Sequence, residues 1–278
     1  MPDKSIFMNI KFLTGIPRSG TTLCCRILNE CNHTVALHEP ISPNKLASSD
    51  KGQAISEILL QARAMYLSVI SGQEVDHGDS TLLIDNPVAE SKDSGSLRQV
   101  KAKRGKIKFD RQPENTTLII KQNALFTSLL PELADNISVT GIIRNPVPVL
   151  LSWMTVNLPV NKGRIPAAER FDTQLNEALN SQVLEARYAS VYNWFIAKFI
   201  QARIHIIKYE DIIATQGSVL TRHLANQTLN YPVMGTVSRS YDESHLSMLK
   251  RILPSLKTQG LYSTDDVEAA FNRVTITD

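Results

Sequence analysis

One short segment of the sequence has the spacing of a phosphate-binding loop. Residues 15–22 read GIPRSGTT, with Gly15 and Gly20 at the positions of the two loop glycines. Glycines permit backbone angles that other residues resist, and the N–H groups of such a loop converge on an anion at the positive end of a helix dipole. The lysine that normally follows the second glycine is absent, because Thr21 stands in its place. The segment therefore predicts a cradle for phosphate or sulfate that lacks the usual lysine.

A second segment contains residues suited to another anion. Arg144 ends an apolar run, and Ser152 follows it in RNPVPVLLS. If a helix begins near Pro146, Arg144 lies at the carboxyl end of a strand and Ser152 lies two turns into the helix. A planar guanidinium fork and a hydroxyl can together bind a phosphate. Arg144 and Ser152 are therefore candidates for a second phosphate site.

The elements around these segments must bring them together. Apolar runs of β type occur at 10–16, 116–121, 137–144 and 204–209, with helical patterns between them. This alternation predicts an α/β, P-loop-containing three-layer fold with a central parallel sheet flanked by helices. Helices are expected at 20–31, 54–71, 147–157, 167–202 and 218–229, and the 167–202 region is long enough to be two helices.

The composition is that of an ordinary globular protein. Its 278 residues are 42% hydrophobic and 21% charged, so we expect a single domain spanning 1–278. A net charge of +3 is too small to indicate a nucleic-acid partner. No membrane-spanning run and no secretory signal are visible, which predicts a cytoplasmic protein. The three cysteines, Cys24, Cys25 and Cys31, lack metal-ligand spacing and are expected to be reduced core residues.

Residues 92–111 differ in composition from the rest of the chain. They contain many Lys and Arg and few apolar residues, which predicts a basic insertion. Apolar residues alternate on both sides of Arg104-Gly105, a pattern that allows a β-hairpin within the segment. The segment is either a solvated surface hairpin or a binding surface for an acidic substrate.

Taken in order, PRSGTT after a strand and R-N-P-x5-S later in the chain resemble the two cofactor motifs of the sulfotransferases that use 3′-phosphoadenosine 5′-phosphosulfate (PAPS). The PRSGTT branch includes the tyrosylprotein sulfotransferases and bacterial sulfotransferases, and it also lacks the P-loop lysine. The likeness runs from Phe12 to about Asp211. It implies that the 5′-phosphosulfate binds to Arg18, Ser19, Gly20, Thr21 and Thr22, and that the 3′-phosphate binds to Arg144 and Ser152.

The resemblance also implies a catalytic base. Glu39, in LHEP, falls at the position of the catalytic glutamate of the branch. An acceptor hydroxyl must lose its proton as it attacks sulfur, and a carboxylate can accept that proton if burial raises its pKa toward neutrality. His38 is the competing candidate. Because adjacent residues of an extended chain point to opposite faces, the two are not expected to serve equally as the base.

Three further positions follow from the resemblance. Lys121 ends the 116–121 run and resembles the strand-terminal lysine that offsets charge on the departing phosphate. Tyr209, in KYEDI, resembles a residue that contacts the cofactor. A late basic loop closes over PAPS in many members, and Arg251 and Lys257 are the candidates for it here. The predicted catalytic residues are Glu39, Lys121 and Arg18.

The predicted reaction is in-line transfer of the sulfuryl group from PAPS to a hydroxyl, with release of adenosine 3′,5′-bisphosphate. Cationic side chains replace a metal ion, so no metal is required. A small-molecule, lipid or carbohydrate acceptor is favoured over a protein tyrosine, and the oligomeric state cannot be deduced. The alternatives are a P-loop kinase or NTPase, with Thr21 or Thr22 on magnesium and Asp85 as its carboxylate, and a catalytically silent PAPS-binding module.

Overall fold

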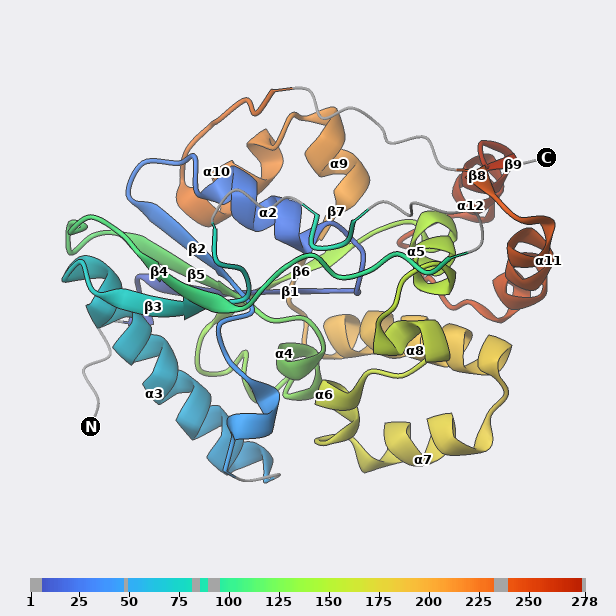
Figure 1. Ribbon diagram of the computed structural model, residues 1–278, viewed down its shortest axis with the longest axis horizontal. Coiled ribbons are helices and arrows are strands. Elements are labelled where there is room, and N and C mark those ends of the chain that lie inside the picture. Colours follow the sequence, from blue (N-terminus) through green and yellow to red (C-terminus); the bar gives the residue numbers. More distant parts are fainter. Residues whose placement is uncertain (1–6, 48–49, 82–85, 90–95, 233–239, 277–278) are drawn as a thin grey trace.

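A parallel β-sheet forms the centre of the structure (Figure 1). The computed structural model describes residues 7–47, 50–81, 86–89, 96–232 and 240–276. Five strands follow one another across the sheet in the order β2-β5-β1-β6-β7, with bounds β1 (Ile10–Gly15), β2 (Thr34–His38), β5 (Thr117–Lys121), β6 (Ser138–Ile143) and β7 (His205–Lys208). Every neighbouring pair is parallel, so the carboxyl ends of all five strands meet at one edge.

Both faces of the sheet are covered by helices. Along β1, Ile10 and Phe12 belong to the larger core and Leu13 to the smaller one on the opposite face, as the two-residue period of a strand requires. The larger core receives α3 (Lys51–Ile70), α4 (Ala124–Ser128), α5 (Pro146–Met154), α8 (Leu184–Gln201) and α11 (Glu243–Ile252). The smaller core receives α2 (Thr21–Leu28), α9 (Tyr209–Ala214) and α10 (Ser218–Ala225). The predicted fold class is therefore confirmed.

The four predicted strands are all present, but the sequence pattern did not predict β2. Its five residues, TVALH, are all buried, yet so short an apolar run has no distinctive period. The 167–202 region contains three helices where two were expected. They are α6 (Pro166–Glu169), α7 (Thr173–Ser181) and α8. The extra boundary arises at Asp172, whose side chain accepts a hydrogen bond from the backbone N–H of Leu175 and caps α7.

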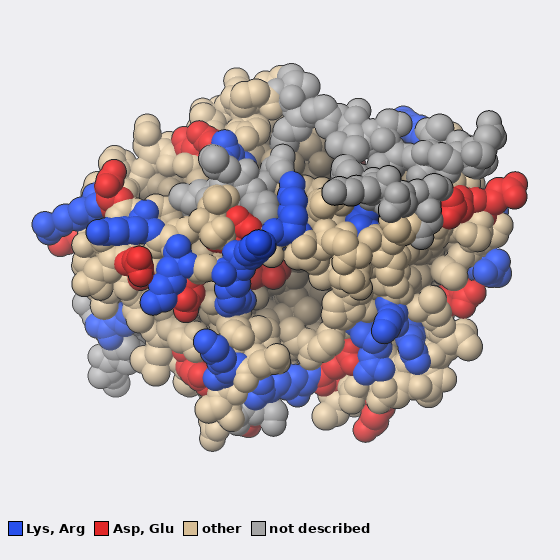
Figure 2. Space-filling model, in the orientation of Figure 1, with Lys and Arg blue, Asp and Glu red and all other residues tan. Residues whose placement is uncertain are grey.

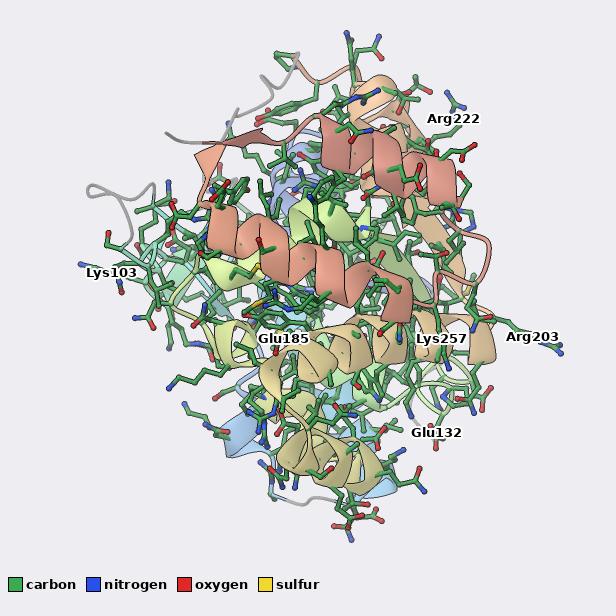
Figure 3. The ribbon with its side chains drawn as sticks, turned by 90° about the vertical axis from the view of Figure 1, so that its right-hand side faces the viewer. Lys103, Glu132, Glu185, Arg203, Arg222 and Lys257 are labelled. Carbon is green, nitrogen blue, oxygen red and sulfur yellow. The ribbon has the colours of Figure 1, made fainter. Side chains whose placement is uncertain are left out.

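The prediction of a β-hairpin within residues 92–111 is wrong. β4 (Gly105–Lys108) pairs in antiparallel fashion with β3 (Glu74–His77), an earlier part of the chain. The reason is apolar burial, because Ile107 and Val75 lie opposite each other and are both buried. Some basic side chains of the segment project outward, as Lys103 does in Figure 3. Residues 92–95 lie outside the described ranges, and the assignment of the segment as an insertion in a single domain stays a prediction.

The remaining described elements are a helix near the C-terminus, a short strand pair and three 3₁₀ turns. They are α12 (Thr264–Asn272), the short strand pair β8 (Ser240–Tyr241) and β9 (Thr275–Ile276), and 3₁₀ turns at Pro43–Lys45, Pro159–Lys162 and Leu253–Ser255. Cys24, Cys25 and Cys31 are buried free thiols, as expected. Among the residues that the structure describes, no helix combines the length and apolar character needed to cross a membrane.

Candidate functional site

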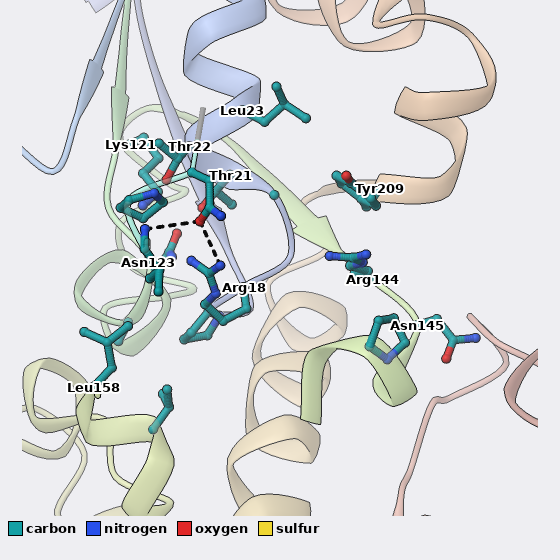
Figure 4. A pocket seen from close by; sticks show the side chains of 18 of the residues that line it. Arg18, Thr21, Thr22, Leu23, Lys121, Asn123, Arg144, Asn145, Leu158 and Tyr209 are labelled. Carbon is teal, nitrogen blue, oxygen red and sulfur yellow. Dashed lines mark hydrogen bonds between the residues drawn. The ribbon is translucent and has the colours of Figure 1, made fainter. Parts of the chain in front are cut away.

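A cavity of about 1440 Å³ lies along the carboxyl edge of the sheet. Its walls include the loop after β1 and the ends of β2, β5, β6 and β7, together with α12. On the face seen in Figure 2, lysine and arginine side chains gather around a central hollow. Figure 4 shows the arrangement inside the cavity: Lys121 and Asn123 lie on one side, Arg144 and Tyr209 on the other, and Arg18 between them.

The loop after β1 is shaped by its two glycines. A Cβ atom on Gly15 would lie 2.5 Å from the Thr21 side chain, and one on Gly20 would lie 2.4 Å from the ring of Tyr209. Gly20 also has a φ of 86°, a left-handed conformation that favours glycine, and it stands at the N-cap of α2. The loop therefore turns tightly and places Thr21 and Thr22 on the cavity wall.

Ser19 has a different orientation from its neighbours in the loop. Its side chain is fully buried, and its hydroxyl donates to the carbonyl oxygen of Ile142 in β6 over 3.1 Å. It does not line the cavity, whereas Arg18, Gly20, Thr21 and Thr22 do. The structure thus gives the Ser19 side chain a role in fixing the loop to the sheet, and its binding role stays a prediction.

Arg18 is held from two directions. Its Nε donates to the Ser152 hydroxyl over 3.1 Å, and its NH2 group donates to Asn86 Oδ1 over 2.9 Å. The loop is also anchored from behind, because the indole N–H of Trp153 donates to the carbonyl oxygen of Pro17 over 2.8 Å. Neither Asn86 nor Trp153 was predicted to support the loop, since no local pattern connects them to it.

Glu39, His38 and Lys121 meet at the ends of two paired strands. Register places His38 of β2 directly beside Lys121 of β5. The Lys121 ammonium lies 2.6 Å from Glu39 Oε1 and 3.3 Å from His38 Nδ1. The Lys121 side chain is 2% exposed, whereas that of Glu39 is 41% exposed. A buried ammonium is therefore paired with a carboxylate that remains open to the cavity.

The premise that His38 and Glu39 point to opposite faces of an extended chain is wrong. Both side chains contact the Lys121 ammonium and both line the cavity. The reason is that β2 ends at His38 and Glu39 has a φ of 46°, so the chain is no longer extended there. Arg104 supports this turn from the basic segment by donating to the backbone carbonyl oxygens of Glu39 and Pro40 over 2.8 and 2.9 Å.

The pKa of Glu39 moves in the direction opposite to the expected one. Burial raises the pKa of this carboxyl, but the Lys121 ammonium and further positive groups outweigh burial and lower the pKa to about 2. Burial, followed by the charge of Lys121, lowers the pKa of His38 to about 3. At neutral pH the site therefore contains a carboxylate, a neutral imidazole and an ammonium.

Arg144 and Tyr209 form the opposite end of the cavity. The Arg144 guanidinium lies 4.3 Å from the centroid of the Tyr209 ring, a cation–π contact. Tyr209 begins α9, and the Tyr192 hydroxyl donates to the Arg144 carbonyl oxygen over 2.9 Å. Glu210 connects this end to the C-terminal region, because it accepts hydrogen bonds from the Asn145 backbone N–H and the Tyr262 hydroxyl. Arg144 and Tyr209 therefore lie together at this end of the cavity, and their contacts with a cofactor stay predictions.

The Ser152 side chain contacts Arg18 and Arg98. Its side chain is buried and does not line the cavity. Its hydroxyl accepts from Arg18 Nε and from the NH2 group of Arg98, each over 3.1 Å. The structure thus places Ser152 behind the loop arginine, and its contact with a 3′-phosphate stays a prediction.

Arg251 and Lys257, the candidates for a basic loop over the cofactor, make their contacts outside the cavity. Arg251 pairs with Glu185, and the backbone N–H of Lys257 donates to Asn193. Glu185 and Lys257 lie beside α11 on the face shown in Figure 3, and neither Arg251 nor Lys257 lines the cavity. Arg273, at the end of α12, lines it instead. No sequence motif marks Arg273, because its place depends on how α12 packs.

The kinase alternative requires a carboxylate that holds magnesium. Asp85, its proposed carboxylate, lies outside the described residues. Within the described ranges, no cluster of three or more His, Cys, Asp or Glu side chains could hold a metal ion.

A phosphate-type loop lies at the carboxyl edge of a parallel sheet, beside the ion pair of Glu39 and Lys121. This arrangement is typical of enzymes that bind an anionic ligand. The sulfotransferase domain family matches residues 11–224, which is more than half of the chain. The protein therefore belongs to this family of PAPS-dependent transferases. A crystal structure of a sulfotransferase from Alicyclobacillus acidocaldarius is also similar, with 12% identity and a TM-score of 0.39 over 95% of each chain. No curated protein matches the sequence.

Proposed function

We propose that the protein transfers the sulfuryl group of PAPS to a hydroxyl group by in-line displacement, with Glu39 as the general base. The observation that carries this proposal is the pairing of Glu39 with Lys121 at 2.6 Å beside the P-loop. An oxygen that attacks sulfur needs a base, and the oxygen that leaves needs a cation. The two groups stand next to each other on one wall of the cavity.

The residues present fit PAPS. Gly20 stands at the N-cap of α2, where backbone N–H groups are suited to bind an anion, and Arg18, Thr21 and Thr22 line the cavity beside it. Arg144, stacked on Tyr209, offers a guanidinium for a second phosphate at the other end. The cavity volume of about 1440 Å³ exceeds that of a typical single-ligand pocket, roughly 300–1,000 Å³. It can therefore accommodate a nucleotide and an acceptor together.

In the proposed step, the acceptor oxygen forms a bond to sulfur and its proton passes to a Glu39 carboxylate oxygen. The bond between sulfur and the bridging phosphate oxygen breaks, and adenosine 3′,5′-bisphosphate leaves. Lys121 and Arg18 offset the charge that develops on the leaving phosphate, in place of a divalent cation. As the Lys121 ammonium turns toward that phosphate, the main cause of the low Glu39 pKa weakens, and Glu39 becomes a stronger base.

The lining of the cavity on the Glu39 side supports an apolar acceptor. The described lining of the cavity includes aliphatic side chains, among them Ile41, Val88, Leu125, Leu158 and Ile165, beside polar groups such as Gln122 and Asn123. The nearby Arg164 is already paired with Glu169. We therefore favour a small-molecule or lipid alcohol over a carbohydrate. In a series of linear alcohols, each buried methylene should raise kcat/KM about threefold to fourfold until the pocket is filled. A flat series, or a preference for sugars, would contradict this choice of acceptor.

The proposed cofactor is tested by calorimetric titration with adenosine 3′,5′-bisphosphate, 5′-AMP and magnesium-ATP. We expect the bisphosphate to bind at least about tenfold more tightly than 5′-AMP, and Arg144→Ala to remove most of that difference. A preference for magnesium-ATP would favour a kinase. Binding of PAPS without turnover on a broad alcohol panel would favour a silent binding module.

A further inference from the structure

The turn that carries Glu39 is held through four successive backbone carbonyl groups, those of residues 38–41. The first carbonyl oxygen accepts from the Gly78 N–H over 2.5 Å, and the last accepts from the Gln122 side-chain amide over 2.6 Å. The two between them accept from the Arg104 guanidinium, over 2.8 and 2.9 Å. A Cβ atom on Gly78 would lie 2.6 Å from the first of these oxygens, so the close approach requires glycine. Other parts of the chain therefore hold the whole turn.

Glu39 needs this outside support because two features of the sequence oppose its conformation. Its φ of 46° lies in the left-handed region, which a residue with a side chain rarely adopts. The residue that follows is Pro40, and a residue before proline favours an extended backbone. Such a conformation persists only where the surrounding contacts impose it. The donors to residues 38–41 supply those contacts.

The Arg104 guanidinium holds two neighbouring carbonyl groups at once. Its NH1 and NH2 groups donate to one carbonyl oxygen each, in the planar fork that distinguishes arginine from lysine. The backbone just before it is fixed by the buried Asp79 carboxylate, which accepts from the Lys103 N–H over 2.9 Å. Arg104 therefore reaches the turn from an anchored backbone, in contrast to the outward-pointing Lys103 side chain (Figure 3).

We infer that Arg104 is a positioning residue that keeps the Glu39 carboxylate at the reacting hydroxyl throughout the transfer. This inference rests on the proposed function. In that reaction the Lys121 ammonium turns toward the leaving phosphate, and Glu39 then loses the 2.6 Å contact that fixes its carboxylate. The hydrogen bonds from Arg104 go to the backbone of the turn, so they remain when Lys121 moves. The base therefore stays in place after its ion-pair partner has left it.

Two substitutions of Arg104 separate its fork from its charge. Arg104→Lys keeps the positive charge and loses the paired hydrogen bonds, so kcat with PAPS and an alcohol at saturation should fall roughly tenfold to a hundredfold. Arg104→Met removes the charge as well, and its kcat should fall at least as far. The affinity of Arg104→Lys for adenosine 3′,5′-bisphosphate, measured by calorimetry, should stay within about twofold of the unaltered protein. Lys103→Met is the matched control and should change neither quantity.

Amide hydrogen exchange tests the turn without any nucleotide. The Glu39 N–H donates to the Lys121 carbonyl oxygen over 2.8 Å, and it should exchange at least about tenfold faster in Arg104→Lys. The Ile119 N–H, in the middle of β5, should exchange at its original rate. Unchanged exchange at Glu39, equal acceleration at Ile119, or an unchanged kcat of Arg104→Lys would overturn the inference. If the unaltered protein neither binds the bisphosphate nor transfers a sulfuryl group, the proposed function fails, while the exchange rates still decide whether Arg104 holds the turn.

Discussion

At the Glu39 end of the cavity, side chains from two paired strands contact one another, whereas at the Arg144 end a single guanidinium rests on one aromatic ring. The first arrangement follows from the β2–β5 register, which sets Lys121 beside His38, and from an ion pair of 2.6 Å. The second depends on α9 for Tyr209 and on α12 for Arg273. The Glu39 end, which is the proposed chemical end, is thus fixed by the sheet itself. The Arg144 end, which is the proposed recognition end, is fixed by helices packed around the sheet.

This difference suggests how the two ends respond to substitution. Groups at the Glu39 end are charged, mutually dependent and next to the proposed reaction, so each should affect turnover strongly. Groups at the Arg144 end should affect binding, and the more exposed ones only modestly. The predictions below test that contrast.

The largest effect is expected for Glu39→Gln. This substitution removes the proposed base with little change in volume, so kcat should fall about 10²–10⁴-fold. The affinity for adenosine 3′,5′-bisphosphate, measured by calorimetry, should change little because no phosphate contact is lost. His38→Gln is the matched control, and its kcat should fall less because a neutral amide can still accept a hydrogen bond from Lys121. The reverse order would make His38 the base.

A somewhat smaller effect is expected for Lys121→Met. The methionine fills the buried space but removes the cation near the leaving oxygen, so kcat should fall about 10²–10³-fold. Stopped-flow or steady-state assays with both substrates saturating will show it. Lys51→Met, at a partly exposed lysine whose ammonium lies 4.0 Å from Glu132, serves as the control for loss of a positive charge. A Lys121→Met enzyme that loses affinity for the bisphosphate but turns over normally would place the lysine at the recognition end.

The sequence predicted the phosphate loop better than it predicted the contacts at either end of the cavity. The loop of residues 15–22 has a local signature in its glycines and threonines, and the four predicted strands have one in their apolar runs. The structure contains the loop and all four strands. The contact of Glu39 with Lys121 depends on β2, a short strand without a distinctive period, and on its pairing with β5. Arg98 and Arg273 come to the site through packing of a distant segment and of a late helix. Such contacts leave no spacing in the sequence that could predict them.

Acid should reduce the stability of the fold through the Glu39 end. Burial lowers the pKa of His38 from 6.5 to about 3, so the unfolded chain binds this proton more strongly than the folded one. The stabilising contribution of the neutral imidazole is therefore present above pH 6.5 and is lost as the pH falls toward 3. Urea unfolding at pH 7 and pH 4.5 should show a smaller free energy of unfolding at the lower pH. His38→Gln should reduce that loss, and Tyr209→Phe, at the other end, should leave it unchanged.

The smallest effect is expected for Arg273→Ala at the recognition end. Arg273 lines the cavity but is exposed, so solvent and salt screen its charge. The affinity for adenosine 3′,5′-bisphosphate should fall only about twofold to fivefold at low ionic strength. The loss should disappear at high salt, and Arg251→Ala, which breaks a surface pair with Glu185, should leave affinity unchanged. A loss that persists at high salt would mean that Arg273 is desolvated when the nucleotide binds. In that case α12 closes over the ligand, and the recognition end becomes as well ordered as the chemical end once the site is filled.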